Sequence, residues 1–382
     1  MAESYDILVA GGSVAGLAFA SEAAKRGASV LVAEEHDEIG EPEKCDGLVS
    51  LRGLVRYGYP PAQDVIQNKI SSAVIHSPSG RRFAVNATAL DVVVLDRSAY
   101  DKQVASEAVS NGAEVRTGSR VASAAVGKDG VQAEVGAREV KAKYLVDATG
   151  PASSPRRGIL PAAKYELEGS WVREHVVEVF LDSTKYPGFF CWVIPYGKER
   201  AKVGAAGYGV NPFKALDAFL EGRDCRVLRK VSAPIYVGGP APRFVESRRI
   251  LVGESAGQVK PTTAGGIMTS VAGAVIAARW TCESLRRGDP ALLGGYQREW
   301  ERAFLKEMKT MVRLRGVLEK LSNQDLEAVF SAVATPKLIT KLSQSDFDFH
   351  GSALLGSLGV PGLLRVAKVV ASAEVRSLLI EG

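Results

Sequence analysis

The 382-residue sequence contains few of the residues that bind metal ions or form disulfides, with only four cysteines and four histidines. Metal sites and disulfide frameworks need such residues in close or paired spacing. The cysteines are far apart, and none belongs to a Cys-x-x-Cys pair: Cys45, Cys191, Cys225 and Cys282. We therefore expect no bound metal ion, and free thiols in a reducing compartment.

Long hydrophobic runs are also missing. No stretch approaches the roughly 18 apolar residues that cross a membrane, and the longest candidate, residues 267–280, contains Arg279. This stretch predicts a buried helix instead. The first residues include Glu3 and Asp6, where a signal peptide would have a basic start, so we expect a cytoplasmic protein.

A strong excess of charge is missing as well, because the net charge is +5 and the isoelectric point is near 8.9. This mild excess fits a phosphate-bearing ligand or an anionic membrane surface, and fits equally a surface that only keeps the protein in solution. We expect no nucleic-acid partner.

The clearest pattern that is present begins the chain. Residues 5–10 form an apolar run typical of a buried strand, residues 17–26 have the alanine-rich spacing of a helix, and residues 28–33 predict a second strand. The turn before the helix reads Gly11, Gly12, Ser13, Val14, Ala15, Gly16. This β-α-β order is the one in which dinucleotides bind.

Each residue type in the turn suits a pyrophosphate at a helix N-terminus. Gly11 permits the tight turn, and Gly16 lets the helix approach the sheet closely. Ser13 replaces the usual middle glycine, and its small hydroxyl side chain can contact phosphate. Glu34, followed by Glu35, ends the second strand and is placed to accept hydrogen bonds from ribose hydroxyls.

Later segments distinguish FAD from NAD through resemblance to flavoproteins. Residues 145–150 (LVDATG) resemble their ATG segment, and residues 251–267 resemble their late "GDxxG…P…GGG" segment, with Glu254 for aspartate and Ala264 for a glycine. Asp96 and Arg97 resemble a third element, whose arginine contacts the cofactor. The resemblance implies FAD and adds these candidate cofactor-binding residues: Cys45, Gly47, Arg97, Val121, Gly253, Glu254, Gly265, Gly266 and Ile267.

Together these segments resemble the p-hydroxybenzoate-hydroxylase-like fold and, within it, the geranylgeranyl reductase family with its archaeal-type digeranylgeranylglycerophospholipid reductases. Residues 40–47 (GEPEKCDG) look like the cysteine segment beside the flavin, which implies that Cys45 is catalytic. Residues 190–195 (FCWVIP) are similar to the YxWxFP substrate motif, and the implied substrate-binding residues are Phe190, Trp192, Ile194 and Pro195. The alternative to a catalytic Cys45 is a cysteine without a chemical role, and the alternative to a substrate motif is an ordinary core strand around Trp192.

The expected fold is α/β, with a Rossmann-like FAD-binding domain, a second antiparallel-sheet substrate domain and a C-terminal helical region. The alternating patterns of residues 165–240 indicate the antiparallel sheet. We predict the FAD-binding domain at residues 1–50, 83–160 and 245–290, the substrate domain at 51–82 and 161–244, and the helical region at 291–382.

The resemblance implies an FAD-dependent oxidoreductase that saturates C=C bonds of isoprenoid lipids by hydride transfer from reduced flavin. NADPH, ferredoxin and a deazaflavin all remain open as electron donors. One alternative is a flavin-dependent monooxygenase or halogenase, since FCWVIP is one tryptophan short of WxWxIP and Lys69 could serve as the halogenase lysine. Another is a non-catalytic flavin-binding protein. Residues 354–380 could form an amphipathic helix that touches a bilayer, or a helix packed on the protein.

Overall fold

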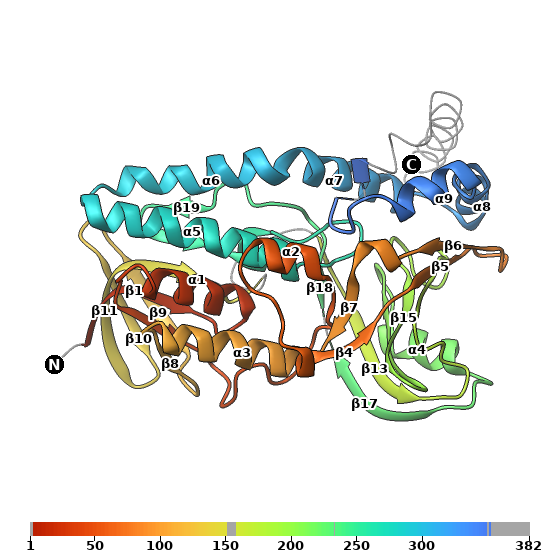
Figure 1. Cartoon of the computed structure of the whole chain (residues 1–382), viewed down its shortest axis with the longest axis horizontal. Coiled ribbons are helices and arrows are strands. Elements are labelled where there is room, and N and C mark those ends of the chain that lie inside the picture. Colours follow the sequence, from red (N-terminus) through yellow and green to blue (C-terminus); the bar gives the residue numbers. More distant parts are fainter. Residues whose placement is uncertain (1–2, 151–157, 233, 350, 353–382) are drawn as a thin grey trace.

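The computed structural model describes residues 3–150, 158–232, 234–349 and 351–352. Figure 1 shows a half built on β1, α1 and α3, a second half built on the sheet of β13 to β17, and long helices across one side of both. The segment 354–380, for which we weighed a membrane-surface helix, lies outside the described residues.

The first half is organised by a sheet with the strand order β19-β20-β11-β1-β2-β8, in which β9 and β10 extend β11 as an antiparallel meander. Strands β8, β2, β1, β11 and β20 run parallel, and β19 is antiparallel to β20. The strands are β1 (Glu3–Ala10), β2 (Val30–Ala33), β8 (Glu114–Arg116), β9 (Val121–Val126), β10 (Val131–Val135), β11 (Arg138–Asp147), β19 (Val245–Glu246) and β20 (Arg249–Leu251).

Alternating side chains of the central strands serve two cores. Ile7 and Val9 of β1 face helices α1, α3 and α5, whereas Leu8 and Ala10 face the β9-β10 meander. This two-sided burial explains why residues 5–10 are a continuous apolar run. The β-α-β unit that we predicted from that run is confirmed, with the helix beginning earlier, at Val14.

The second half contains a sheet with the order β17-β13-β16-β15-β14-β5-β6, antiparallel except where β14 and β5 run parallel. Its strands are β5 (Ser72–His76), β6 (Arg82–Asn86), β13 (Ala162–Glu168), β14 (Val176–Phe180), β15 (Cys191–Gly197), β16 (Arg200–Ala206) and β17 (Arg226–Ser232). The predicted domain boundary between residues 82 and 83 falls inside β6, and the division into domains remains a prediction.

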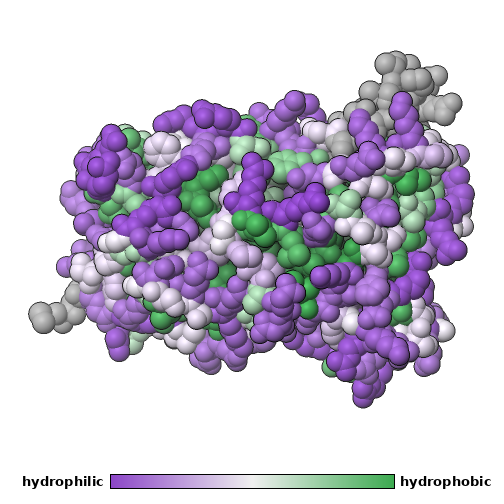
Figure 2. Space-filling model, viewed as in Figure 1, coloured by the Kyte–Doolittle hydropathy of each residue, from purple (hydrophilic) through white to green (hydrophobic). Residues whose placement is uncertain are grey.

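Smaller sheets join the two halves. A three-stranded sheet has the order β3-β7-β4, and β12 pairs with β18. Their bounds are β3 (Leu48–Ser50), β4 (Ile66–Lys69), β7 (Val92–Leu95), β12 (Ile159–Leu160) and β18 (Ile235–Tyr236). On the face drawn in Figure 2, apolar side chains gather in the middle, between the two halves, and polar side chains cover most of the rest.

Local signals in the sequence account for several helix ends. Asp96 accepts a hydrogen bond from the Ala99 N–H at the start of α3, and Ser322 and Asp325 form a capping box on α8. Gly288 ends α5 in the left-handed conformation. The helices are α1 (Val14–Ala24), α2 (Leu51–Arg56), α3 (Arg97–Ser110), α4 (Pro212–Leu220), α5 (Ile267–Arg287), α6 (Gly294–Trp300), α7 (Lys306–Leu318), α8 (Asn323–Val333) and α9 (Pro336–Ser343).

Helix α5 confirms the buried helix expected over residues 267–280, because most of its side chains pack against α1 and the parallel sheet. Within the described ranges, no helix combines the length and the apolar character that crossing a membrane requires.

Candidate functional site

A cavity of about 1300 Å³ opens at the carboxyl ends of β1, β2 and β11. Ligands of open α/β sheets bind at this edge. Candidate cofactor residues from distant parts of the sequence line the cavity together: Gly11, Ser13, Glu34, Glu35, Cys45, Arg97, Val121 and Glu254.

The glycine turn leaves no space for side chains. Gly11 has a φ of +101°, and a Cβ atom there would lie 2.7 Å from the Ala148 carbonyl oxygen. A Cβ at Gly16 would lie 2.1 Å from the Gly11 carbonyl oxygen. Both glycines therefore allow α1 to sit directly on the end of β1.

The N-terminus of α1 is suited to hold a pyrophosphate. Its N-cap, Ser13, makes no side-chain capping hydrogen bond, and the first turn contains no acidic residue. Its first N–H groups and about half a positive charge are therefore available to an anion in the cavity. Val14, Ala15 and Gly16 form this first turn behind the cavity wall.

Glu34 is held in place at the end of β2. Its Oε2 accepts a hydrogen bond from the Gly12 N–H at 2.6 Å, and its Oε1 accepts one from the His36 N–H at 3.0 Å. Burial raises the pKa of Glu34, but these donors outweigh burial and hold the pKa below its usual range. Glu34 is therefore a fixed carboxylate that can also accept from ribose hydroxyls, whereas Glu35 is more exposed and pairs with Arg120 at 3.5 Å.

Glu254 reaches the same cavity from the turn after β20. Gly253 lets this turn approach α1, since a Cβ there would lie 2.7 Å from the Ala15 Cβ. Burial raises the pKa of Glu254 to about 7, and the backbone N–H of Tyr236 opposes this only in part. A half-buried carboxylate so poor in donors fits a ligand that carries hydroxyl groups, as the ribityl chain of FAD does.

The raised pKa of Glu254 gives a testable pH dependence. A carboxyl whose folded pKa is above its unfolded pKa stabilises the fold at low pH and loses this contribution as pH rises through 7. We expect Glu254→Gln to stabilise the FAD-free protein at pH 8 by about 1–3 kcal/mol more than at pH 5. Urea unfolding at both pH values measures this. Glu35→Gln serves as the exposed control, and an equal effect of Glu254→Gln at both pH values would contradict the assignment.

The remaining predicted cofactor residues do not line this cavity in the described part of the chain. Gly47 has a φ of +81° and lies against β7, where a Cβ would be 2.2 Å from the Leu95 carbonyl oxygen. Gly265, Gly266 and Ile267 lie in the loop before α5 and at its first residue. We keep them as predicted contacts to the cofactor.

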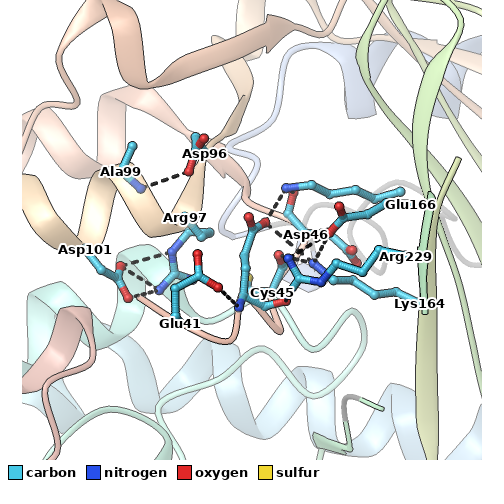
Figure 3. A network of polar contacts seen from close by, with 12 residues as sticks. Glu41, Cys45, Asp46, Asp96, Arg97, Ala99, Asp101, Lys164, Glu166 and Arg229 are labelled. Atoms are coloured by element: carbon cyan, nitrogen blue, oxygen red, sulfur yellow. Dashed lines mark hydrogen bonds and ion pairs between the residues drawn. The ribbon is translucent and has the colours of Figure 1, made fainter. Parts of the chain in front are cut away.

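Cys45 and Arg97 meet at the cavity. Arg97, at the start of α3, donates from Nη2 to Asp101 Oδ1 at 2.9 Å and Oδ2 at 3.0 Å. Burial by itself would lower the pKa of Arg97. Asp101 and the hydrogen-bonded Cys45 outweigh burial and raise this pKa above its usual value, so the guanidinium stays charged. Cys45 itself is exposed toward the cavity. Figure 3 shows Cys45 between the Arg97–Asp101 pair and a second group of charged residues.

The predicted substrate motif begins at Phe190, one residue before β15, and continues along β15. It lies behind the cysteine loop and outside the cavity lining. Trp192 Nε1 donates to Asp46 Oδ2 at 2.7 Å, and Phe190 stacks on Phe189 with ring centroids 4.0 Å apart. Trp192 and Ile194 belong to the apolar cluster between the sheet and β7. The Pro195 carbonyl accepts from Asn68 Nδ2 at 2.9 Å. The motif therefore contributes an aromatic and apolar layer next to the cysteine loop.

Sequence reasoning missed the charged contacts that join Glu43 and Asp46 of this loop to Lys164 and Lys202 of the second sheet. Both lysines are buried in the second sheet, with side chains 1% and 2% exposed. Alternation gives no signal for this burial, because Lys164 and Lys202 lie on the strand faces opposite to the apolar side chains. The residues described contain no group of three metal-ligating side chains. Lys69 is exposed at the end of β4 and does not line the cavity.

Comparison with known proteins agrees with this geometry. Residues 4–209 match the FAD binding domain family. The chain is 32% identical over 360 residues to digeranylgeranylglycerophospholipid reductase 2 of Methanopyrus kandleri, and this match covers 86% of this chain and 90% of that protein. The corresponding enzyme of Methanothermobacter thermautotrophicus is 30% identical over 368 residues, covering 89% and 94%.

A solved structure has a similar fold over nearly the whole length. The geranylgeranyl bacteriochlorophyll reductase-like protein of Thermoplasma acidophilum has a TM-score of 0.84 and 24% identity, and the match covers 98% of this chain and 99% of that one. Halogenases share the architecture at lower TM-scores, so the fold by itself does not distinguish the two chemistries.

Proposed function

The chain belongs to the geranylgeranyl reductase family of FAD-binding proteins, and from this premise we propose that it saturates C=C bonds in the isoprenoid chains of a geranylgeranyl lipid. The observation that carries the proposal is the meeting of three features in one place. The glycine turn and Glu254 bound the cofactor cavity, Cys45 opens into it, and the aromatic layer of Trp192 lies behind the cysteine loop.

The residues fit FAD, because the cavity has a helix N-terminus for the pyrophosphate and carboxylates for the sugar hydroxyls. When bound, FAD in its reduced form supplies the hydride. The first turn of α1 would hold the pyrophosphate, Glu34 the ribose and Glu254 the ribityl chain. Burial against these walls excludes water from the reacting groups.

Cys45 is the residue that we propose as proton donor. Its thiol proton would go to one alkene carbon while the other receives the hydride, and water would then return a proton to the exposed sulfur. Phe190, Trp192 and Ile194 would bind the hydrocarbon, whose main binding term is burial from water, at about 25 cal/mol per Å². The apolar side chains that Figure 2 shows on the surface between the two halves support entry of the lipid's hydrocarbon chain at that place.

Access to such a lipid requires peripheral contact with a bilayer, which we include in the proposal. The electron donor in this proposal is one of three: NADPH, ferredoxin or a deazaflavin. No observation favours the halogenase alternative, since Lys69 lies outside the cavity lining in the described residues.

Anaerobic single turnover tests the function. Reduced, FAD-loaded protein mixed with digeranylgeranylglycerol phospholipid should return its flavin absorbance to the oxidised spectrum, and the lipid should gain one pair of hydrogens per saturated bond by mass spectrometry. A fully saturated lipid is the control. A hydroxylated or halogenated aromatic product formed only with oxygen would overturn the proposal, and no flavin oxidation under either condition would indicate a non-catalytic flavin-binding protein.

A further inference from the structure

The loop that carries Cys45 is fastened to the second sheet by cations from three neighbouring strands. Lys164 Nζ of β13 donates to the Cys45 carbonyl oxygen at 3.0 Å. Lys202 Nζ of β16 donates to the Asp46 carbonyl oxygen at 3.4 Å. Arg229 Nη2 of β17 donates to the Glu43 carbonyl oxygen at 3.0 Å. These bonds fix the backbone on both sides of the thiol, as Figure 3 shows for Lys164 and Arg229.

A carboxylate of the same loop completes the attachment. Glu43 Oε1 accepts from Lys202 Nζ at 2.5 Å and lies 3.5 Å from Lys164 Nζ. Burying an ammonium group costs several kcal/mol unless it is paired and hydrogen-bonded. Apolar side chains could fill the same positions of the sheet at no such cost. Two buried lysines directed at one short loop therefore indicate a role in placing that loop.

Acidic and basic side chains surround the cysteine loop in equal number. The groups that face the cysteine loop from the loop itself, β13, β16, β17 and α3 are Glu41, Glu43, Lys44, Asp46, Lys164, Glu166, Lys202, Arg229, Arg97 and Asp101. Burial raises the pKa of Asp46 against the opposing effect of Lys164 and Lys202, and its Oδ1 has no partner among the described residues.

We propose that Lys164 and Lys202 are positioning residues for Cys45, which hold the cysteine loop and so place its thiol at the cofactor cavity. The inference rests on the proposed role of Cys45. In the step concerned, the S–H bond breaks, a C–H bond forms at one alkene carbon, and the hydride of reduced FAD forms the other C–H bond. Water then reprotonates the sulfur.

Thiol alkylation tests this without any lipid. The FAD-loaded protein is treated with iodoacetamide at pH 7, and modification of Cys45 is followed by mass spectrometry with buried Cys191 as internal reference. Lys164→Met and Lys202→Met should each raise the rate of Cys45 alkylation about threefold or more, because a loop released from the sheet exposes its thiol to the reagent. Lys230→Met removes an exposed lysine of β17 and should change nothing.

Two further variants test the attachment itself. Glu43→Gln removes the carboxylate that both lysines contact and should raise the alkylation rate in the same direction, whereas Lys202→Arg keeps a cationic donor and should preserve the rate. If the lysine variants leave the alkylation rate unchanged, the proposal is wrong.

Reductase assays give the second readout. Lys202→Met should lower kcat at least about tenfold while KM changes less than about threefold, because the lysine acts on the proton donor rather than on lipid binding. Absence of reductase activity in the unmodified protein would refute the proposed function but would leave the alkylation result as a separate test of the lysines.

Discussion

Replacing Gly16 by valine is expected to abolish FAD binding. The Cβ alone would lie 2.1 Å from the Gly11 carbonyl oxygen and 3.1 Å from the Ala148 Cβ, so α1 would have to move away from the sheet. That movement removes the helix N-terminus from the proposed pyrophosphate position. We expect FAD affinity to fall at least about 100-fold, equivalent to about 3 kcal/mol, measured by flavin fluorescence titration.

A matched glycine offers the control. Gly316 lies inside α7, where a Cβ would meet nothing within 4 Å. Gly316→Ala should bind FAD normally and gain up to about 1 kcal/mol of stability, since alanine is the better helix former. Normal FAD content in the Gly16→Val protein would show that the cofactor does not use this turn.

The second large effect concerns a buried ion pair made by Lys260, which lies in the loop between β20 and α5. Lys260 Nζ lies 2.8 Å from Asp348 Oδ1, both side chains are 4% exposed, and the Phe347 ring lies 4.2 Å from the ammonium. Asp348→Ala leaves the Lys260 charge buried without its carboxylate. We expect a loss of about 3–5 kcal/mol in the free energy of unfolding, measured by urea denaturation.

Restoring neutrality should reverse this loss. The double replacement Lys260→Met with Asp348→Leu removes both charges and is expected to lie within about 1–2 kcal/mol of the original protein. Glu38→Gln breaks the exposed pair with Lys102 and should cost less than about 1 kcal/mol. A cost for Asp348→Ala no larger than for Glu38→Gln would mean that the Lys260 pair contributes nothing to the fold.

Local patterns explain why the first unit could be predicted from the sequence. The strand over residues 5–10, the glycine turn and Glu34 are close in sequence, so periodicity and residue type define them directly. The antiparallel second sheet was also predicted from its alternation. The parallel pairing of β5 with β14 was not, because it joins segments about a hundred residues apart and neither strand carries a signal for its partner.

The charged attachment of the cysteine loop could not be predicted for the same reason. Lys164 and Lys202 lie on strands where alternation alone would place a lysine facing solvent. Their burial depends on a loop near residue 45 that reaches across from the other half. Cys45 and Arg97 were each identified by resemblance, but their direct contact follows only from the packing of α3 against that loop.

Strand order also constrains how the protein can be made. β11 precedes β13 to β17 in the chain, whereas its partner β20 follows them. The nascent chain must therefore carry an unpaired edge at the end of β11 while β13 to β17 are being translated, a state prone to aggregation. Glu254 follows β20 and is the last of the cavity-lining residues along the chain. The cavity can therefore be completed only late in biosynthesis, after most of the chain has been translated.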